Sequence, residues 1–145
     1  MNPPRRLILA APALVALVRP ARATPQRLAE AIRGFTGGAE PRPGRVRLEV
    51  PPLVENGNTV PLSVQVESPM TVADHVRAIA VFNELNPQPH VITAQLGPRA
   101  GRAFLATHIR LATSQTLVAV AQLSDGGFWS DSAQVVVTLA ACVEG

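Results

Sequence analysis

The chain has 145 residues, 47% of them hydrophobic, which suffices for one globular domain and is too short for two. Its 13 basic residues are all arginine and stand against ten acidic residues. Four of these arginines fall in the first 23 residues, where we predict a removable leader, so nine remain and the mature chain has a formal charge of −1. Nucleic-acid binding requires clustered basic residues. The mature chain has no such cluster, which excludes this class of function.

Residues 1–23 have the three parts of an export signal. Arg5 and Arg6 form the charged start, an apolar run follows at residues 7–18, and residues 21–23 form a small-x-small cleavage site. The apolar run is too short to span a membrane as a stable helix, so we expect no membrane span after removal of the signal. The paired arginines favour the twin-arginine route, with an ordinary secretory signal as the alternative. We therefore expect a periplasmic protein.

A short helix is predicted over residues 24–38. Pro25 suits the first helical position, and glycines at positions 37 and 38 end the helix. Four residues at helical spacing form one apolar stripe: Leu28, Ala31, Ile32 and Phe35. Such a stripe docks either on the protein's own sheet or on a partner subunit. Residues 39–44, with two prolines, are expected to be a linker.

From residue 45 onward, short apolar runs are separated by turn residues, and several of them alternate with polar residues. We predict strands at residues 45–50, 60–67, 76–85, 91–96, 103–111, 116–123 and 128–139. The run at 76–85 is ambiguous between helix and strand, and the stiff turn at 86–89 favours a strand. About seven short strands at regular spacing predict an all-β fold, an immunoglobulin-like β-sandwich over residues 45–139. The paired cysteines of a true immunoglobulin domain are absent.

No group of residues has catalytic or metal-binding spacing. His75, His90 and His108 are far apart in sequence, and a single cysteine cannot supply a thiolate zinc site. No glycine-rich loop precedes a helix in a phosphate-binding pattern. We therefore expect no catalytic residues, no metal and no cofactor. Phe128 and Trp129 follow a tight turn and fit either core packing or an aromatic contact for a partner protein.

The single cysteine, Cys142, lies in the segment 140–145 that follows the last predicted strand. Chain ends are poorly ordered unless they are tied down, and an unpaired cysteine in an exported protein indicates intermolecular pairing or a reactive thiol. The alternative is a small buried hydrophobic residue. Glu144 and the terminal carboxylate favour a solvated tail, and their negative charge disfavours a self-activated thiolate. We therefore expect an exposed cysteine on which other enzymes act.

Six stretches, spread along the mature chain, carry a resemblance. They are Glu-Asn-Gly-Asn-Thr-Val-Pro at 55–61, Ser-Pro-Met-Thr at 68–71, Asn-Pro-Gln-Pro at 86–89, Ile-Arg-Leu-Ala at 109–112, Val-Ala-Val-Ala at 118–121 and Ser-Asp-Gly at 124–126. In this order they resemble the SoxY family, the sulfur-carrier subunit of the periplasmic Sox system for thiosulfate oxidation. The leader and the short helix fit the same family.

The resemblance implies a carrier rather than an enzyme, with an immunoglobulin-like sandwich that pairs with a second β-subunit, SoxZ. Cys142 would bind sulfur species covalently and enter the active sites of separate oxidising and hydrolysing enzymes. The family's tail is Gly-Gly-Cys-Gly-Gly, whereas the residues around this cysteine are Ala140, Ala141, Val143, Glu144 and Gly145. Alanine stiffens an arm that glycine leaves flexible.

This variant tail indicates a SoxY-related paralogue in which the residues around the cysteine tune the shape of the arm and its recognition by enzymes. Two alternatives remain open at this point. One is a structural or adaptor sandwich with a buried or disulfide-linked Cys142, and the other is a carrier of a different cargo.

Overall fold

The computed structural model describes residues 25–142. The elements in chain order are α1 (Pro25–Thr36), β1 (Arg42–Pro43), β2 (Val46–Glu49), β3 (Leu53–Val54), β4 (Val60–Val66), β5 (Val76–Asn83), β6 (His90–Gln95), a 3-10 helix η1 (Pro98–Ala100), β7 (Ala103–Ile109), β8 (Gln115–Leu123) and β9 (Phe128–Val137). The predicted leader at residues 1–23 lies outside the described residues, and so do Val143, Glu144 and Gly145.

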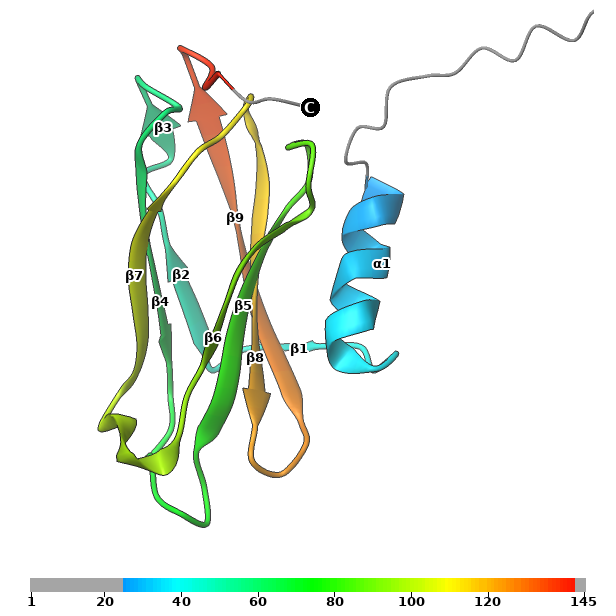
Figure 1. Cartoon of the computed structure of the whole chain (residues 1–145), viewed down its shortest axis with the longest axis vertical. Helices are drawn as coiled ribbons and strands as arrows, with labels where there is room; N and C mark the ends of the chain where they lie inside the picture. Colours follow the sequence, from blue (N-terminus) through cyan, green and yellow to red (C-terminus); the bar gives the residue numbers. More distant parts are fainter. Residues whose placement is uncertain (1–24, 143–145) are drawn as a thin grey trace, which may run out of the picture.

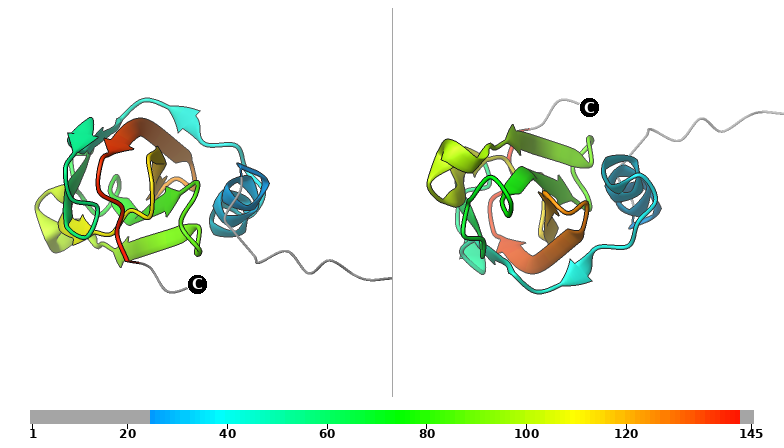
Figure 2. Two further views of the ribbon diagram at one scale, coloured as in Figure 1. Left: turned by 90° about the horizontal axis from the view of Figure 1, so that it is seen from above. Right: turned by 90° about the horizontal axis from the view of Figure 1, so that it is seen from below.

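The strands form two sheets that pack face to face (Figures 1 and 2). The larger sheet has the order β1-β9-β8-β5-β6, with β3 also paired to β9, and the smaller sheet has the order β2-β4-β7. All seven predicted strands are present, with one short helix before them, so the prediction of an all-β, immunoglobulin-like sandwich is confirmed.

Two short strands in the structure are not predicted by the sequence pattern. β1 lies in residues 39–44, so the expectation of a plain linker there is wrong. β3 lies between the predicted strands at 45–50 and 60–67, where we expect no strand. Both strands run parallel to the long strand β9. Two residues are too few to show any hydrophobic periodicity, and the proline in β1 is tolerated because this strand lies at the edge of its sheet.

β5 and β8 are buried on both faces. Their inner faces contribute residues such as Ile79 and Leu117 to the core between the sheets. Their outer faces contribute Ala80, Phe82 and Val120, which contact the apolar stripe of α1 (Figure 2). Docking of the helix on the protein's own sheet is thus the alternative observed. A strand covered on both faces has no reason to alternate apolar with polar residues, which explains the ambiguous pattern at 76–85.

The aromatic pair at the start of β9 packs within the protein. The Phe128 ring lies 5.9 Å from the ring of Phe35 in α1. Trp129 packs against the core between the sheets, and the guanidinium groups of Arg42 and Arg45 lie 4.6 and 5.6 Å from its ring centre. Core packing is therefore the alternative that the structure supports for both residues.

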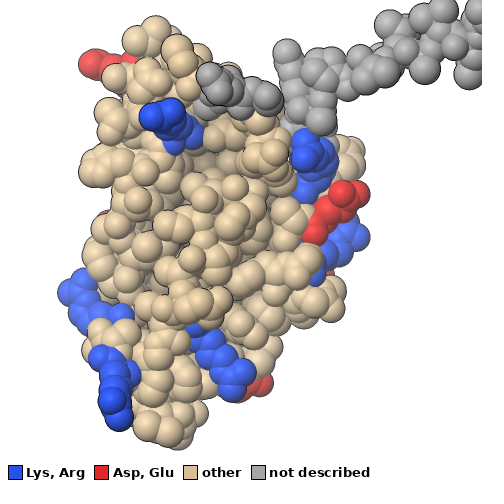
Figure 3. Space-filling model, viewed as in Figure 1, with Lys and Arg blue, Asp and Glu red and all other residues tan. Residues whose placement is uncertain are grey.

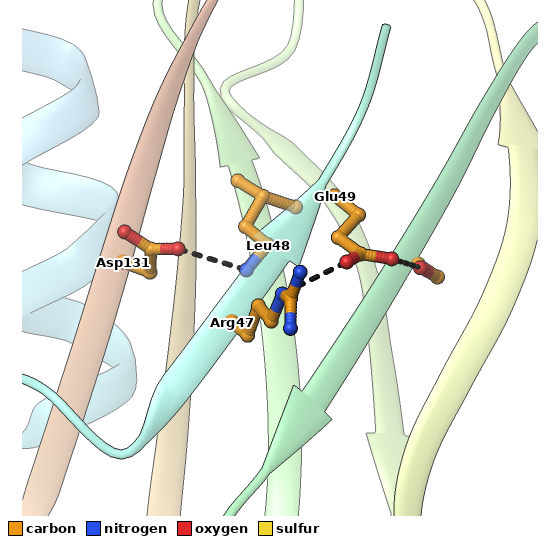
Figure 4. A network of polar contacts seen from close by, with 5 residues as sticks. Arg47, Leu48, Glu49 and Asp131 are labelled. Carbon is orange, nitrogen blue, oxygen red and sulfur yellow. Dashed lines mark hydrogen bonds and ion pairs between the residues drawn. The ribbon is translucent and has the colours of Figure 1, made fainter.

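Asp131 in β9 ties the two sheets together along one edge (Figure 4). Its Oδ2 accepts a hydrogen bond of 2.8 Å from the backbone N–H of Leu48 in β2. The bond satisfies a donor on the edge of β2 that faces away from β4. Arg47 and Glu49 form a 2.8 Å ion pair on the outer side of the same strand. Both side chains are more than half exposed, so this pair contributes little to stability.

Candidate functional site

Cys142 lies at the upper end of the sandwich, a few residues after β9 (Figure 1). Its thiol is free and the residue is exposed, as the sequence predicts. Ala140 is exposed as well, whereas Ala141 between them is buried. The chain thus remains in contact with the sandwich up to the residue immediately before the cysteine.

Gly57 is the point at which the sandwich holds this segment. Its N–H donates to the Leu139 carbonyl oxygen at 2.8 Å, and its own carbonyl oxygen accepts from the Leu111 N–H at 2.8 Å. A Cβ atom at this position would lie 2.5 Å from the Leu111 carbonyl oxygen and 2.9 Å from the Ala141 nitrogen. These are backbone atoms that cannot turn aside. Glycine is therefore required here because the backbones approach so closely.

Asn58 holds the backbone of the cysteine itself. Its Oδ1 accepts a hydrogen bond of 3.2 Å from the Cys142 N–H. Its Nδ2 donates to Asn56 Oδ1 at 3.1 Å, which orients the amide. The N–H of Ala141 donates to the Leu111 carbonyl oxygen at 3.0 Å. The chain is therefore fixed as far as the backbone of Cys142, while the thiol faces outward.

A pocket of about 610 Å³ opens beside the thiol. It is lined by Asn83, Asn86, Pro87, Gln88, His90, Val91, Arg110 and Cys142. These residues come from the end of β5, the loop to β6, the start of β6 and the segment after β7. No carboxylate is among them, and Arg110 contributes a permanent positive charge. The charge of the pocket lining is therefore positive, which favours an anion.

Buried amide side chains hold the walls of this pocket in place. Asn83, 1% exposed, accepts from the Asn86 N–H at 3.0 Å and donates to the Gln88 carbonyl oxygen at 2.8 Å. Asn86 Oδ1 accepts from Gln115 Nε2 at 2.8 Å, and Asn86 Nδ2 donates to the carbonyl oxygen of Arg110 at 2.8 Å. The loop after β5 and the backbone of Arg110 are thus fixed relative to each other.

A larger groove of about 700 Å³ runs along the outer face of β2, β4 and β7. His108 lines it, but Cys142 does not. Its size therefore does not identify it as the functional site.

The structure does not bring the three histidines together. The Nδ1 of His75 lies 3.0 Å from the Thr71 carbonyl oxygen, His108 lies in the groove on the smaller sheet, and only His90 lies in the pocket beside Cys142. Within residues 25–142, no group of three or more His, Cys, Asp or Glu side chains could hold a metal ion.

Sequence reasoning missed Gly57, Asn58 and Arg110 as site residues. The signal that could have found them lies in the stretches that carry the resemblance. The stretch 55–61 holds the segment before Cys142, the stretch 86–89 lines the pocket, and the stretch 109–112 supplies Arg110. Three stretches that are distant in sequence therefore meet at the cysteine.

A protein-family model described as sulfur oxidation protein SoxY matches residues 32–142. The chain belongs to the SoxY family. Among solved structures, the sulfur carrier protein SoxY from Chlorobium limicola f thiosulfatophilum superposes with a TM-score of 0.65 and 26% identity, over 79% of this chain and 98% of that chain. A comparison with curated proteins found no match. The resemblance stated from the sequence is confirmed at the level of the family.

Superoxide reductases share the SoxY fold. The enzyme from Ignicoccus hospitalis, a neelaredoxin, has a TM-score of 0.58 and 18% identity, over 65% of this chain and 80% of that chain. A putative superoxide reductase from Thermotoga maritima has a TM-score of 0.54 and 24% identity, over 71% and 89%. These likenesses concern the fold alone. No helix in the described part of the chain has the length and hydropathy needed to cross a membrane.

Proposed function

We propose that this SoxY-family chain carries sulfur covalently on Cys142 in a Sox-type, thiosulfate-oxidising system. Membership of a family of sulfur carriers supports the reaction class. One observation supports the assignment to Cys142: at this residue the chain changes from a backbone held by the sandwich to an exposed side chain. Its backbone is held by Asn58 while its thiol is exposed beside a pocket.

The chemistry of carriage follows from a single thiol. Coupling of the Cys142 thiol to thiosulfate forms a sulfur–sulfur bond, giving Cys–S–S–SO₃⁻, and releases one proton and two electrons. The chain has one cysteine, so it can form no internal disulfide that would accept these electrons. Hydrolysis then removes the terminal sulfonate as sulfate and leaves a persulfide and a proton. Both steps need separate enzymes, and this chain would be their substrate rather than a catalyst.

Residues 140–145 would form the arm that presents the cysteine to these enzymes. Ala140 and Ala141 would be its base, which rests on the sandwich between reactions, and Val143, Glu144 and Gly145 its outer part. The bulk and charge of this outer part would be recognised by the enzymes that load and unload the thiol. Such recognition would separate this paralogue from carriers with a glycine arm.

The protein would act in the periplasm as a heterodimer with a SoxZ-like β-subunit. The family supports this pairing, and the export signal expected at residues 1–23 supports the compartment. Co-purification of a tagged chain from the periplasmic fraction, followed by mass spectrometry, would test both together. Recovery from the cytoplasmic fraction, or recovery without a second β-subunit, would contradict this assignment.

The test of the carrier function is the intact mass of the protein purified from its own periplasm, before and after a reductant. We expect added mass on the peptide that bears Cys142, in steps of sulfur or sulfur–oxygen units that the reductant removes. Cys142→Ser is the matched control and should carry no such mass. A bare thiol that also resists iodoacetamide in the folded protein would leave the structural or adaptor role instead.

A further inference from the structure

The pocket beside Cys142 contains a cation without a partner among the described residues. The Arg110 side chain forms neither an ion pair nor a hydrogen bond with any other residue in the range 25–142. It lines the same pocket as the thiol. Exposed arginines without a partner are common. This one shares a pocket with the only cysteine of the chain, so a group bound to that cysteine could be its ligand.

The surroundings of Arg110 favour an anion. The acidic residue of the neighbouring loop, Glu84, directs Oε2 to the Thr116 N–H at 3.2 Å and does not line the pocket. The amide of Gln88 and the ring of His90 add possible hydrogen-bond donors. A volume of about 610 Å³ is within the usual range for small-ligand sites.

We propose that this pocket binds the sulfonate end of the cargo while the cargo is attached to Cys142, with Arg110 as the principal contact. The inference rests on the proposed function, since it assumes a cargo on this thiol. A guanidinium presents planar N–H donors that match the oxygens of an oxyanion, and such charge-assisted bonds are stronger than neutral ones. A persulfide or a free thiol lacks these oxygens. Arg110 therefore distinguishes a carrier loaded with thiosulfonate from one whose sulfonate has been removed.

The upper end of the face drawn in Figure 3 carries a basic patch and, at its left corner, an acidic patch, while the middle of this face shows neither acidic nor basic side chains. Among the described residues that line the pocket, Arg110 carries the one permanent charge.

The test compares two adducts on the same thiol. Tetrathionate converts the Cys142 thiolate into Cys–S–S–SO₃⁻ and releases thiosulfate, which gives the anionic cargo. Methyl methanethiosulfonate converts the same thiolate into Cys–S–S–CH₃ and releases methanesulfinate, which gives a neutral cargo of similar length. The thermal unfolding midpoint is then measured for each loaded protein.

In the wild type we expect the anionic adduct to unfold roughly 4 °C above the neutral one, the size of shift that one charge-assisted contact gives to a domain of this size. Arg110→Ala should abolish this difference, and Arg110→Lys should retain part of it. Arg99→Ala is the matched control, because Arg99 is also exposed but lies in η1 at the opposite end of the sandwich (Figure 1). It should behave as the wild type.

The outcomes separate the two proposals. If both reagents modify Cys142 but the two adducts unfold at the same temperature in the wild type, the sulfonate site is refuted and the carrier function stands. A difference that persists in Arg110→Ala also refutes the role of this arginine. If neither reagent modifies the folded protein, the thiol is not accessible and the carrier function itself fails.

Discussion

Replacing Gly57 by alanine tests whether the sandwich holds the segment before Cys142 as the structure indicates. The added Cβ would lie 2.5 Å from the Leu111 carbonyl oxygen, about 1 Å closer than ordinary van der Waals contact. Side-chain rotation cannot relieve this, since the two closest contacts, to the Leu111 carbonyl oxygen and the Ala141 nitrogen, are to backbone. The φ angle at Gly57 is not in the left-handed region, so the effect would be steric rather than conformational.

The magnitude follows from the bonds that must open. Separating the two backbones weakens the hydrogen bonds from Gly57 to Leu139, from Leu111 to Gly57 and from Ala141 to Leu111, of 2.8, 2.8 and 3.0 Å. At about 1 kcal/mol net for each bond, the free energy of unfolding should fall by about 2–3 kcal/mol. Overpacking of a tight site gives the same range. The core between the sheets does not include Gly57, so the domain should still fold.

The assay is urea unfolding followed by the fluorescence of Trp129, the single tryptophan, together with hydrogen exchange of the Ala141 and Cys142 amides. We expect a lower midpoint and faster exchange at both amides. Gly97→Ala is the control, because Gly97 has an extended backbone and nothing within 4 Å of the added Cβ. A Gly57→Ala protein with the wild-type midpoint and unchanged exchange would refute the placement of this segment.

Three further substitutions probe the surroundings of the site. Asn58→Ala removes the acceptor of the Cys142 N–H, so alkylation of Cys142 by iodoacetamide should become about threefold faster than in the wild type. Thr59→Ala is the control and should leave the rate unchanged. An Asn58→Ala protein that is alkylated at the wild-type rate would argue against this hydrogen bond. Gln115→Leu leaves the Leu85 N–H and Asn86 Oδ1 without this partner, so the free energy of unfolding measured by urea titration should fall by about 2–3 kcal/mol. An unchanged free energy of unfolding would mean that the amide network is dispensable. Phe35→Ala removes ring contacts with the larger sheet, so the free energy of unfolding should fall by about 2 kcal/mol in the same titration, while the rate of Cys142 alkylation should not change. Faster alkylation would show that the helix and the site are coupled.

The strands could be predicted from the sequence because most of them have one face in the core and one in water. β4 alternates buried and less buried residues along its length, and the pattern of its valines and leucine reports this directly. β1 and β3 could not be predicted, since each is a two-residue strand that exists only because β9 offers an edge to pair with. Their existence is decided by tertiary pairing rather than by local preference.

The candidate site was only partly predictable. Cys142 could be found because it is the single cysteine and follows the last strand. Gly57 lies between two predicted strands, and nothing local indicates that its missing side chain makes room for a backbone 54 or more residues away in sequence. Arg110 gives no signal of its own among 13 arginines. What distinguishes it is the pocket, which forms only when the loop after β5 and the segment after β7 come together.

The same contacts bear on how a stiff arm can still deliver its cargo. Releasing the cysteine would open the hydrogen bonds of Ala141 to Leu111 and of Cys142 to Asn58, and would expose the buried methyl group of Ala141. At about 1 kcal/mol for each bond and slightly less for the methyl group, release costs about 2–3 kcal/mol. Roughly one molecule in 30 to 150 would then be released at any moment, and an enzyme that binds only this state would see its affinity reduced by that factor. The cysteine would therefore rest on the sandwich between reactions, and the enzymes would draw on a small released population.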